Sequence, residues 1–183
     1  MANKTFTSIG QTLTEDVAKN KYSSTAYYTL RLKAKLNHIS EDTLKANVTM
    51  EGILISKYIS WEDDTIIFSL GVNGETVATA SARNGGSNDS PKTYVEWTGD
   101  IPYKEDGTLI ATLTASSSDD NGTYSPPNQT ATIIATFPVI EVANVRLAID
   151  GAIKKTQAYI GVGGVPKKCD VYVGNNGIPS KSY

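Results

Sequence analysis

The sequence predicts an all-β protein, a two-layer sandwich followed by three short hairpins, and three observations support this prediction. Apolar and polar residues alternate with a period of two along several segments, as they do in half-buried strands. Gly, Ser, Asn and Pro gather between those segments, where turns are expected. The last 39 residues repeat a 13-residue unit three times.

The clearest strand spans residues 26–36 (AYYTLRLKAKL), because every second residue is apolar. Residues 44–50 repeat the pattern. Together the two segments are predicted to place one face of a sheet in the core, with these inward residues: Tyr28, Leu30, Leu32, Ala34, Leu36, Leu44, Ala46, Val48 and Met50.

Residues 65–70 (TIIFSL) and 75–82 are predicted to pair through Asn73-Gly74, a dipeptide typical of tight hairpin turns. Further strands are expected at residues 94–97, 108–115 and 130–137, for a total of about seven. Only residues 14–18 have any helical character, and residues 1–20 are expected to form an N-terminal arm. The sandwich is therefore assigned to residues 21–144.

Seven antiparallel strands, two tryptophans and polar Gly/Ser/Asn loops favour an immunoglobulin-like β-sandwich. A jelly-roll is the alternative, because it also stacks two antiparallel sheets. Such sandwiches serve many functions, so the fold alone does not define one.

The three C-terminal copies begin at residues 145, 158 and 171 and read VRLAIDGAIKKTQ, AYIGVGGVPKKCD and VYVGNNGIPSKSY. Each is predicted to be a hairpin, because a short apolar run is followed by a turn pair that accepts positive φ angles. An isolated hairpin is marginal in water, so we expect residues 145–183 to mediate attachment or oligomerisation. The predicted assembly positions are the register-matched residues Leu147, Ile160, Val173, Ala152, Val165, Ile178, Gly151, Gly164 and Gly177.

Charge is distributed unevenly along the chain. The last 39 residues carry six Lys and Arg against two Asp, a net charge of +4, whereas the preceding residues carry 11 basic and 17 acidic side chains, a net charge of −6. This asymmetry suggests that the tail meets an acidic surface, such as the body of a second copy, but it is too weak to indicate nucleic acid. No apolar run matches a membrane span or a secretory signal, so we expect synthesis in a cytoplasm and no membrane insertion.

The titratable residues do not predict an enzyme. His38 is the only histidine and has no second histidine to complete a Ser/His or metal site, and Cys169 is the only cysteine. The carboxylate clusters at residues 62–64 and 105–106 resemble turn chemistry, although a hydrolase that uses Glu62, Asp63 or Glu105 is the catalytic alternative. Residues 119–122 (DDNG) lack the spacing of a calcium loop. We therefore expect no catalytic residue, no cofactor and no metal.

Two long polar loops, residues 84–91 and 116–127, are where a binding sandwich would carry its ligand site. Asn88, Asp89, Tyr124 and Trp97 are the residues expected to contact a sugar or protein surface. Solvated connecting loops would have the same composition.

Two parts of the sequence resemble bacteriophage minor structural proteins, particularly those of phages that infect Gram-positive hosts. Residues 22–30 (YSSTAYYTL) are similar to an early strand of that family, and residues 103–111 (YKEDGTLIA) to a later strand led by an Asp-Gly-Thr turn. The family often has a His-Asn pair ahead of that turn, where this chain has Pro102-Tyr103. Residues 159–168 (YIGVGGVPKK) and 171–178 (VYVGNNGI) resemble runs near the ends of phage tail and baseplate proteins.

The resemblance implies a virion component of the tail or baseplate that contacts other virion proteins and could reach the host surface, and the repeats lead us to expect a homo-oligomer. It implies no transferable catalytic residue. The alternatives are a capsid decoration protein and an adhesion module that binds carbohydrate on the host surface.

Overall fold

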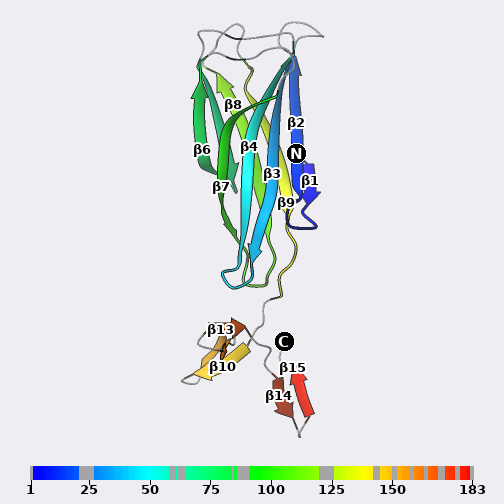
Figure 1. Ribbon diagram of the computed structural model, residues 1–183, viewed down its shortest axis with the longest axis vertical. Helices are drawn as coiled ribbons and strands as arrows, with labels where there is room; N and C mark the ends of the chain where they lie inside the picture. Colours follow the sequence, from blue (N-terminus) through cyan, green and yellow to red (C-terminus); the bar gives the residue numbers. More distant parts are fainter. Residues whose placement is uncertain are drawn as a thin grey trace.

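The computed structural model describes residues 2–20, 27–57, 61, 65–83, 85, 91–119 and 126–141, and the backbone of six short strands between residues 145 and 181. The described residues form an all-β structure in which two sheets pack face to face (Figure 1). The sandwich strands are β1 Ala2–Thr5, β2 Thr12–Asn20, β3 Tyr27–Ser40, β4 Lys45–Lys57, β5 Ile66–Val72, β6 Glu75–Ala82, β7 Lys92–Pro102, β8 Ile110–Asp119 and β9 Gln129–Thr136.

One sheet has five strands in the order β1-β9-β8-β5-β6, and the other has four in the order β2-β3-β4-β7. Strands β2, β3 and β4 form an antiparallel meander in the four-stranded sheet. The chain then crosses to the β5–β6 hairpin, returns for β7, and crosses again to β8 and β9. The pairing of β1 with β9 is parallel. This alternation between layers gives a β-sandwich, as predicted.

The core lies between the two sheets and contains the inward face predicted for residues 26–36. Tyr28, Leu30, Leu32, Ala34 and Leu36 are fully buried on β3. Phe68, Leu70, Leu113, Ile133 and other inward residues of the five-stranded sheet complete the same cluster. Burying each large apolar side chain contributes about 1.5–3 kcal/mol, so this alternation is the main stabilising feature of the fold.

Several strands are longer than the sequence pattern predicts. Strand β4 continues beyond residue 50 to Lys57, and β7 spans Lys92–Pro102 instead of residues 94–97. The prediction that Leu44 begins a strand is wrong, because Leu44 lies in the preceding turn with a φ of 52°. Both strands continue across a register shift in their mutual pairing next to Gly52. This shift interrupts the alternation of inward and outward side chains, so the sequence pattern stops short of the strand ends.

The expected N-terminal arm is instead part of the sandwich. Strand β1 adds to the five-stranded sheet and β2 to the four-stranded sheet, so the sandwich has nine strands and not seven. Residues 14–18, expected to have helical character, lie inside β2. Phe6 and Leu13 enter the core, and the aromatic ring of Phe6 lies 4.9 Å from that of Phe137. The burial of these two apolar residues fixes the N-terminal strands.

The turn predicted at Asn73-Gly74 is confirmed. Asn73 and Gly74 have φ angles of 53° and 88°, the left-handed conformations that a two-residue hairpin turn requires. The Asn73 side-chain Oδ1 also accepts a hydrogen bond of 2.9 Å from the Thr112 amide on β8. The turn is therefore held both by its own backbone conformation and by the neighbouring strand.

The C-terminal region contains six short strands that pair two by two. They are β10 Val145–Ile149, β11 Ala152–Thr156, β12 Tyr159–Val162, β13 Val165–Lys168, β14 Tyr172–Asn175 and β15 Ile178–Lys181. Strand β10 pairs with β11, β12 with β13 and β14 with β15, each antiparallel and each across a two-residue connection. Within the described ranges, no helix is long and apolar enough to cross a membrane.

Candidate functional site

The ends of strands from both sheets gather at one end of the sandwich, which we call the connection end. There β2, β4, β6 and β8 end and β3, β5, β7 and β9 begin (Figure 1). The pairing of Ile66 with both Ala82 and Asp119 places the last residues of β6 and β8 beside the start of β5. The predicted ligand loop at 84–91 follows β6, whereas the one predicted at 116–127 begins inside β8, because residues 116–119 are strand. The two therefore extend from strands that both pair with β5.

An aromatic cluster fills the core at the connection end. The Trp61 ring centroid lies 6.1 Å from that of Tyr28 and 5.8 Å from that of Tyr94, and Tyr94 stacks on Phe68 at 4.4 Å. Aromatic pairs at these separations contribute about 0.5–1.5 kcal/mol beyond their buried area. This cluster could not be predicted from the sequence, because its members come from four separate segments.

Trp61 is anchored by a backbone bridge to Gly85. The Trp61 amide donates to the Gly85 carbonyl at 2.9 Å, and the Gly85 amide donates back to the Trp61 carbonyl at 3.1 Å. An added Cβ at Gly85 would lie well inside van der Waals contact of the indole and 2.5 Å from the Tyr94 hydroxyl oxygen. Glycine is required here by a close approach of two side chains.

Two buried polar side chains in this half of the core have no hydrogen-bond partner among the described residues. They are the indole Nε1 of Trp61 and both amide atoms of Gln129, the first residue of β9. Gln129 is only 4% exposed. A buried polar group that is left without any partner costs about 1–3 kcal/mol.

The predicted ligand residues differ in where they fall. Asn88, Asp89 and Tyr124 lie outside the described residues. Trp97 lies on β7, where it is half-buried and packs against the core. Its indole covers the α-carbon of Gly99, so closely that a Cβ there would collide with the ring. This position gives Trp97 a packing role at the margin of the sandwich, in contrast to the exposed ligand contact predicted from the sequence.

The predicted catalytic alternatives are partly outside the described residues as well. Glu62, Asp63 and Asp64 are not described. His38 lies on β3, and Glu105 is exposed between β7 and β8. Neighbouring Asp106 caps its turn: its Oδ1 accepts hydrogen bonds from the Thr108 amide at 2.9 Å and hydroxyl at 2.6 Å, which lower the pKa of this carboxyl. In the described part of the chain, no group of three or more His, Cys, Asp or Glu could hold a metal ion.

The outer faces of the two sheets differ in charge. The four-stranded sheet carries cross-strand ion pairs between Arg31 and Asp16 at 2.7 Å and between Lys33 and Glu51 at 2.8 Å. The five-stranded sheet has no charged residue throughout β5 and β9 or from residue 110 to 118 of β8. Its outward positions alternate with core residues and mostly carry hydroxyl groups, and we call them the hydroxyl face: Ser69, Thr112, Thr114, Ser116, Thr130 and Thr132.

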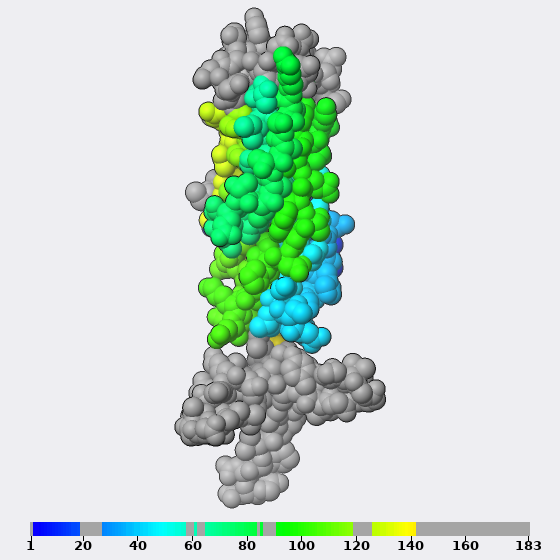
Figure 2. All heavy atoms as spheres, turned by 90° about the vertical axis from the view of Figure 1, so that its left-hand side faces the viewer, coloured from blue at the N-terminus to red at the C-terminus, as the bar shows by residue number. Residues whose placement is uncertain are grey.

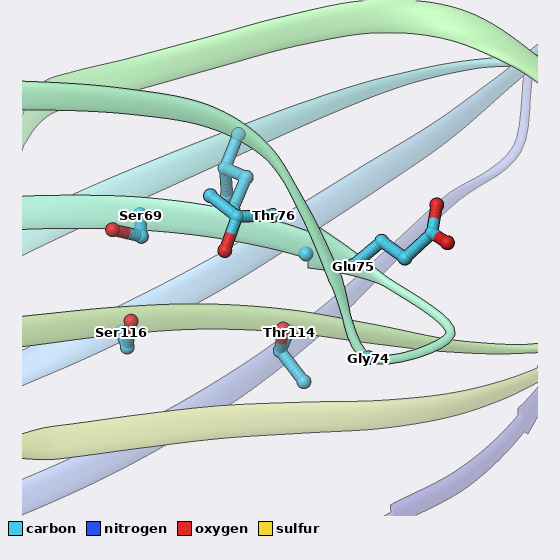
Figure 3. A pocket seen from close by; sticks show the side chains of 8 residues that line it. Ser69, Gly74, Glu75, Thr76, Thr114 and Ser116 are labelled. Atoms are coloured by element: carbon cyan, nitrogen blue, oxygen red, sulfur yellow. The ribbon is translucent and has the colours of Figure 1, made fainter.

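A hollow of about 70 Å³ interrupts the hydroxyl face next to the turn between β5 and β6. Figure 3 shows Ser69, Thr76, Thr114 and Ser116 around it, and the Glu75 side chain extending away from them. The hollow exists because Gly71 has no side chain: a Cβ there would lie 2.6 Å from Thr114 Oγ1. Its size and polar lining suit a few water molecules.

Comparison with known proteins finds no matching family model, no matching curated protein and no matching solved structure. The proposals below therefore rest on the sequence and on the geometry of the described residues.

Proposed function

We propose that this chain is a bacteriophage virion structural protein, a minor component of the tail or baseplate. In this proposal an immunoglobulin-like sandwich forms the body, and the three C-terminal hairpins attach the protein to a neighbour. Its role is structural and not enzymatic. The protein is made in the host cytoplasm and ends up in the virion.

The order of the strands supports an immunoglobulin-like topology over a jelly-roll. Strands β3, β4 and β7 lie in one sheet, and β5, β6, β8 and β9 lie in the other. The order in which the chain passes between the two sheets is that of an immunoglobulin-like sandwich. Strand β6 extends the second sheet beside β5, as an additional strand does in variable-type domains. Strands β1 and β2 then extend each sheet at the opposite margin.

The observation that carries the proposed attachment role is the matching register of the three C-terminal hairpins. Ile149 pairs with Ala152, Val162 with Val165 and Asn175 with Ile178, so each two-residue connection falls at the same place in its copy. Leu147 and Ala152 of the first copy, and their counterparts in the other two copies, belong to these ladders, whereas Gly151, Gly164 and Gly177 lie outside the described residues. Three short hairpins in matching register are suited to strand addition or packing against a partner.

The path of the chain out of the sandwich also supports this arrangement. The Phe137 amide donates to the Leu109 carbonyl at 3.0 Å, and the Ile140 amide donates to the Gly107 carbonyl at 3.1 Å. The Tyr103 hydroxyl donates to the Pro138 carbonyl at 3.0 Å. These contacts hold residues 137–140 against the β7–β8 connection, so a load on the hairpins would reach the sandwich through a fixed segment.

Immunogold electron microscopy of phage particles, with antibody raised against the sandwich, tests the proposed virion location. Discrete label on tails or baseplates is the expected result. Label on the capsid would favour a decoration protein, and particles without label, with the protein free in the lysate, would refute a virion role.

Deletion of residues 145–183 tests the attachment role. We expect the shortened protein to unfold cooperatively, like the full chain, because the sandwich core comes from residues 6–140. It should nevertheless be missing from particles. A shortened protein that is still incorporated would contradict attachment through the hairpins.

A second candidate function is an adhesion module that binds glycans of the host surface. It is favoured by the adjacent exit of the β6–β7 and β8–β9 connections, which contain Asn88, Asp89 and Tyr124. Glycan-array binding that is lost on Tyr124→Ala, with unfolding unchanged, would support it. Array binding that survives this change would count against these loops as the ligand site.

A further inference from the structure

Strand β6 is an exposed sheet margin. It pairs with β5 on one side, and no strand in the described part of the chain pairs with its other side. Figure 2 looks at this side of the molecule and shows the teal residues of β6 lying at the surface beside the green residues of β7. An unpaired margin presents backbone amides and carbonyls that can accept a further strand.

Two of the other margins, β1 and β7, have features that hinder strand addition. Strand β1 has only four residues, and its Lys4 side chain donates to the Thr14 carbonyl and pairs with Glu15 at 3.0 Å, which ties β1 to β2. Strand β7 carries the Trp97 indole across Gly99, a register shift near Gly52, and Pro102 at its end. Short strands, prolines, irregular register and charged residues are the usual devices against edge pairing.

Strand β6 has fewer of these devices, because its register with β5 shifts only once, at Val77, and its pairing is regular from Ala78 to Ala82. Its sequence ETVATASA contains no Pro, Gly, Lys or Arg, and Glu75 is its only charged residue. From Val77 to Ala82 the side chains are small or β-branched, so a second backbone can approach closely. The adjoining hydroxyl face carries no charge that would repel an identical surface.

We propose that β6 is a self-association edge, at which β6 of a second copy pairs antiparallel about a two-fold axis at Thr79. The register then pairs Thr79 with Thr79 of the second copy and Ala78 with Ala80, within the regular segment that follows the shift at Val77. The two five-stranded sheets become one continuous sheet. This interface is separate from the C-terminal hairpins and does not depend on the proposed virion role.

Charge complementarity favours a second copy of this chain as the partner that pairs with β6. A two-fold interface must be self-complementary, so each charged group needs its counterpart on the same strand. Exposed Glu75 begins β6 and exposed Arg83 directly follows it, four residues on either side of Thr79. An antiparallel arrangement brings the Glu75 end of each β6 toward the Arg83 end of the other copy, at both ends of the paired segment. Pairing of one strand buries little area, so we expect a weak, concentration-dependent dimer.

A charge placed on the two-fold axis tests this register. Thr79 is exposed, so Thr79→Lys is expected to leave unfolding unchanged while setting two ammonium groups opposite each other in the dimer. Sedimentation of the full chain should show a dissociation constant raised at least tenfold. The matched control is Thr130→Lys, an exposed threonine of the same sheet on β9, which should associate like the wild type. Mixing Thr79→Lys with Thr79→Glu should restore association.

Cysteine cross-linking distinguishes this interface from association through the hairpins. In a Cys169→Ser background, Thr79→Cys should form a disulfide-linked dimer under mild oxidation, because directly paired residues lie within disulfide reach. Thr130→Cys should not. Equal cross-linking of the two variants, or a Thr79→Lys protein that sediments like the wild type, would overturn the proposal.

Discussion

Replacing Gly85 with alanine puts a methyl group into space that the Trp61 indole now occupies. The added Cβ would overlap two carbons of the six-membered ring and lie 2.5 Å from the Tyr94 hydroxyl oxygen. Ordinary contacts of a Cβ begin at about 3.4 Å. The indole would therefore have to move by about 1 Å, since two backbone hydrogen bonds hold Gly85 against Trp61.

The indole cannot make this shift without cost. Trp61 is 1% exposed and packs against Tyr28 and Tyr94, and Tyr94 is in turn stacked on Phe68. Forcing an extra carbon into such a core costs about 1–3 kcal/mol. We expect Gly85→Ala to lower the free energy of unfolding by that amount.

A double-mutant cycle with Trp61→Phe attributes the cost to this contact. Phenylalanine lacks the two ring carbons that the methyl group would strike, so Gly85→Ala should cost at least about 1 kcal/mol less in the Trp61→Phe background. Urea unfolding followed by far-ultraviolet circular dichroism measures all four proteins. Additive costs, or a Gly85→Ala protein within about 0.5 kcal/mol of the wild type, would refute the predicted overlap.

Three further predictions follow from individual contacts. The Arg31 guanidinium, hydrogen bonded to Asp16, lowers the pKa of that carboxyl below 3.8, so the stabilisation is present above about pH 4 and is lost as the pH falls through the folded-state pKa. Because this pair is partly exposed, a cycle of Asp16→Asn and Arg31→Gln should give a coupling below about 1 kcal/mol at pH 7 that shrinks as the carboxyl is protonated; a coupling that does not fall with pH would contradict the ion pair. Asn73→Gly keeps the turn conformation but leaves a β8 amide without its acceptor, and should cost about 1 kcal/mol in urea unfolding; an unchanged midpoint would refute this role. Burial raises the pKa of Tyr103, and Tyr103→Phe should cost about 1 kcal/mol and speed amide exchange at Ile140; unchanged exchange would show that its bond to Pro138 does not hold the exit segment.

The strands predicted most accurately are those whose core side is set by a period of two. Residues 26–36 and the turn at Asn73-Gly74 match the structure because their signals are local: alternating side chains and a dipeptide that accepts positive φ. The pattern is weaker in β2, where Glu15 lies on the inward side between Leu13 and Val17 and forms an ion pair with Lys4. The sequence pattern therefore predicts an arm here, whereas pairing with β3 along its whole length makes this segment a strand.

The candidate site could be predicted only in part for the same reason. The polar composition of residues 84–91 and 116–127 is visible in the sequence, but the pairing of Ile66 with Ala82 and Asp119 that brings their strands together is not. The packing of Trp97 could not be predicted from the sequence, because it depends on Gly99, two residues along β7, leaving room for the indole.

By itself, the sequence determined the all-β class, the inward face of β3, the hairpin at Asn73-Gly74 and the 13-residue period of the C-terminal region. Each is encoded within a few residues by side-chain alternation or by backbone preference. Only the tertiary structure decided the nine-strand arrangement, the aromatic cluster around Trp61 and the contrast between the charged and hydroxyl faces. Only it left β6 as an open margin, because sheet order depends on contacts between residues far apart in the chain.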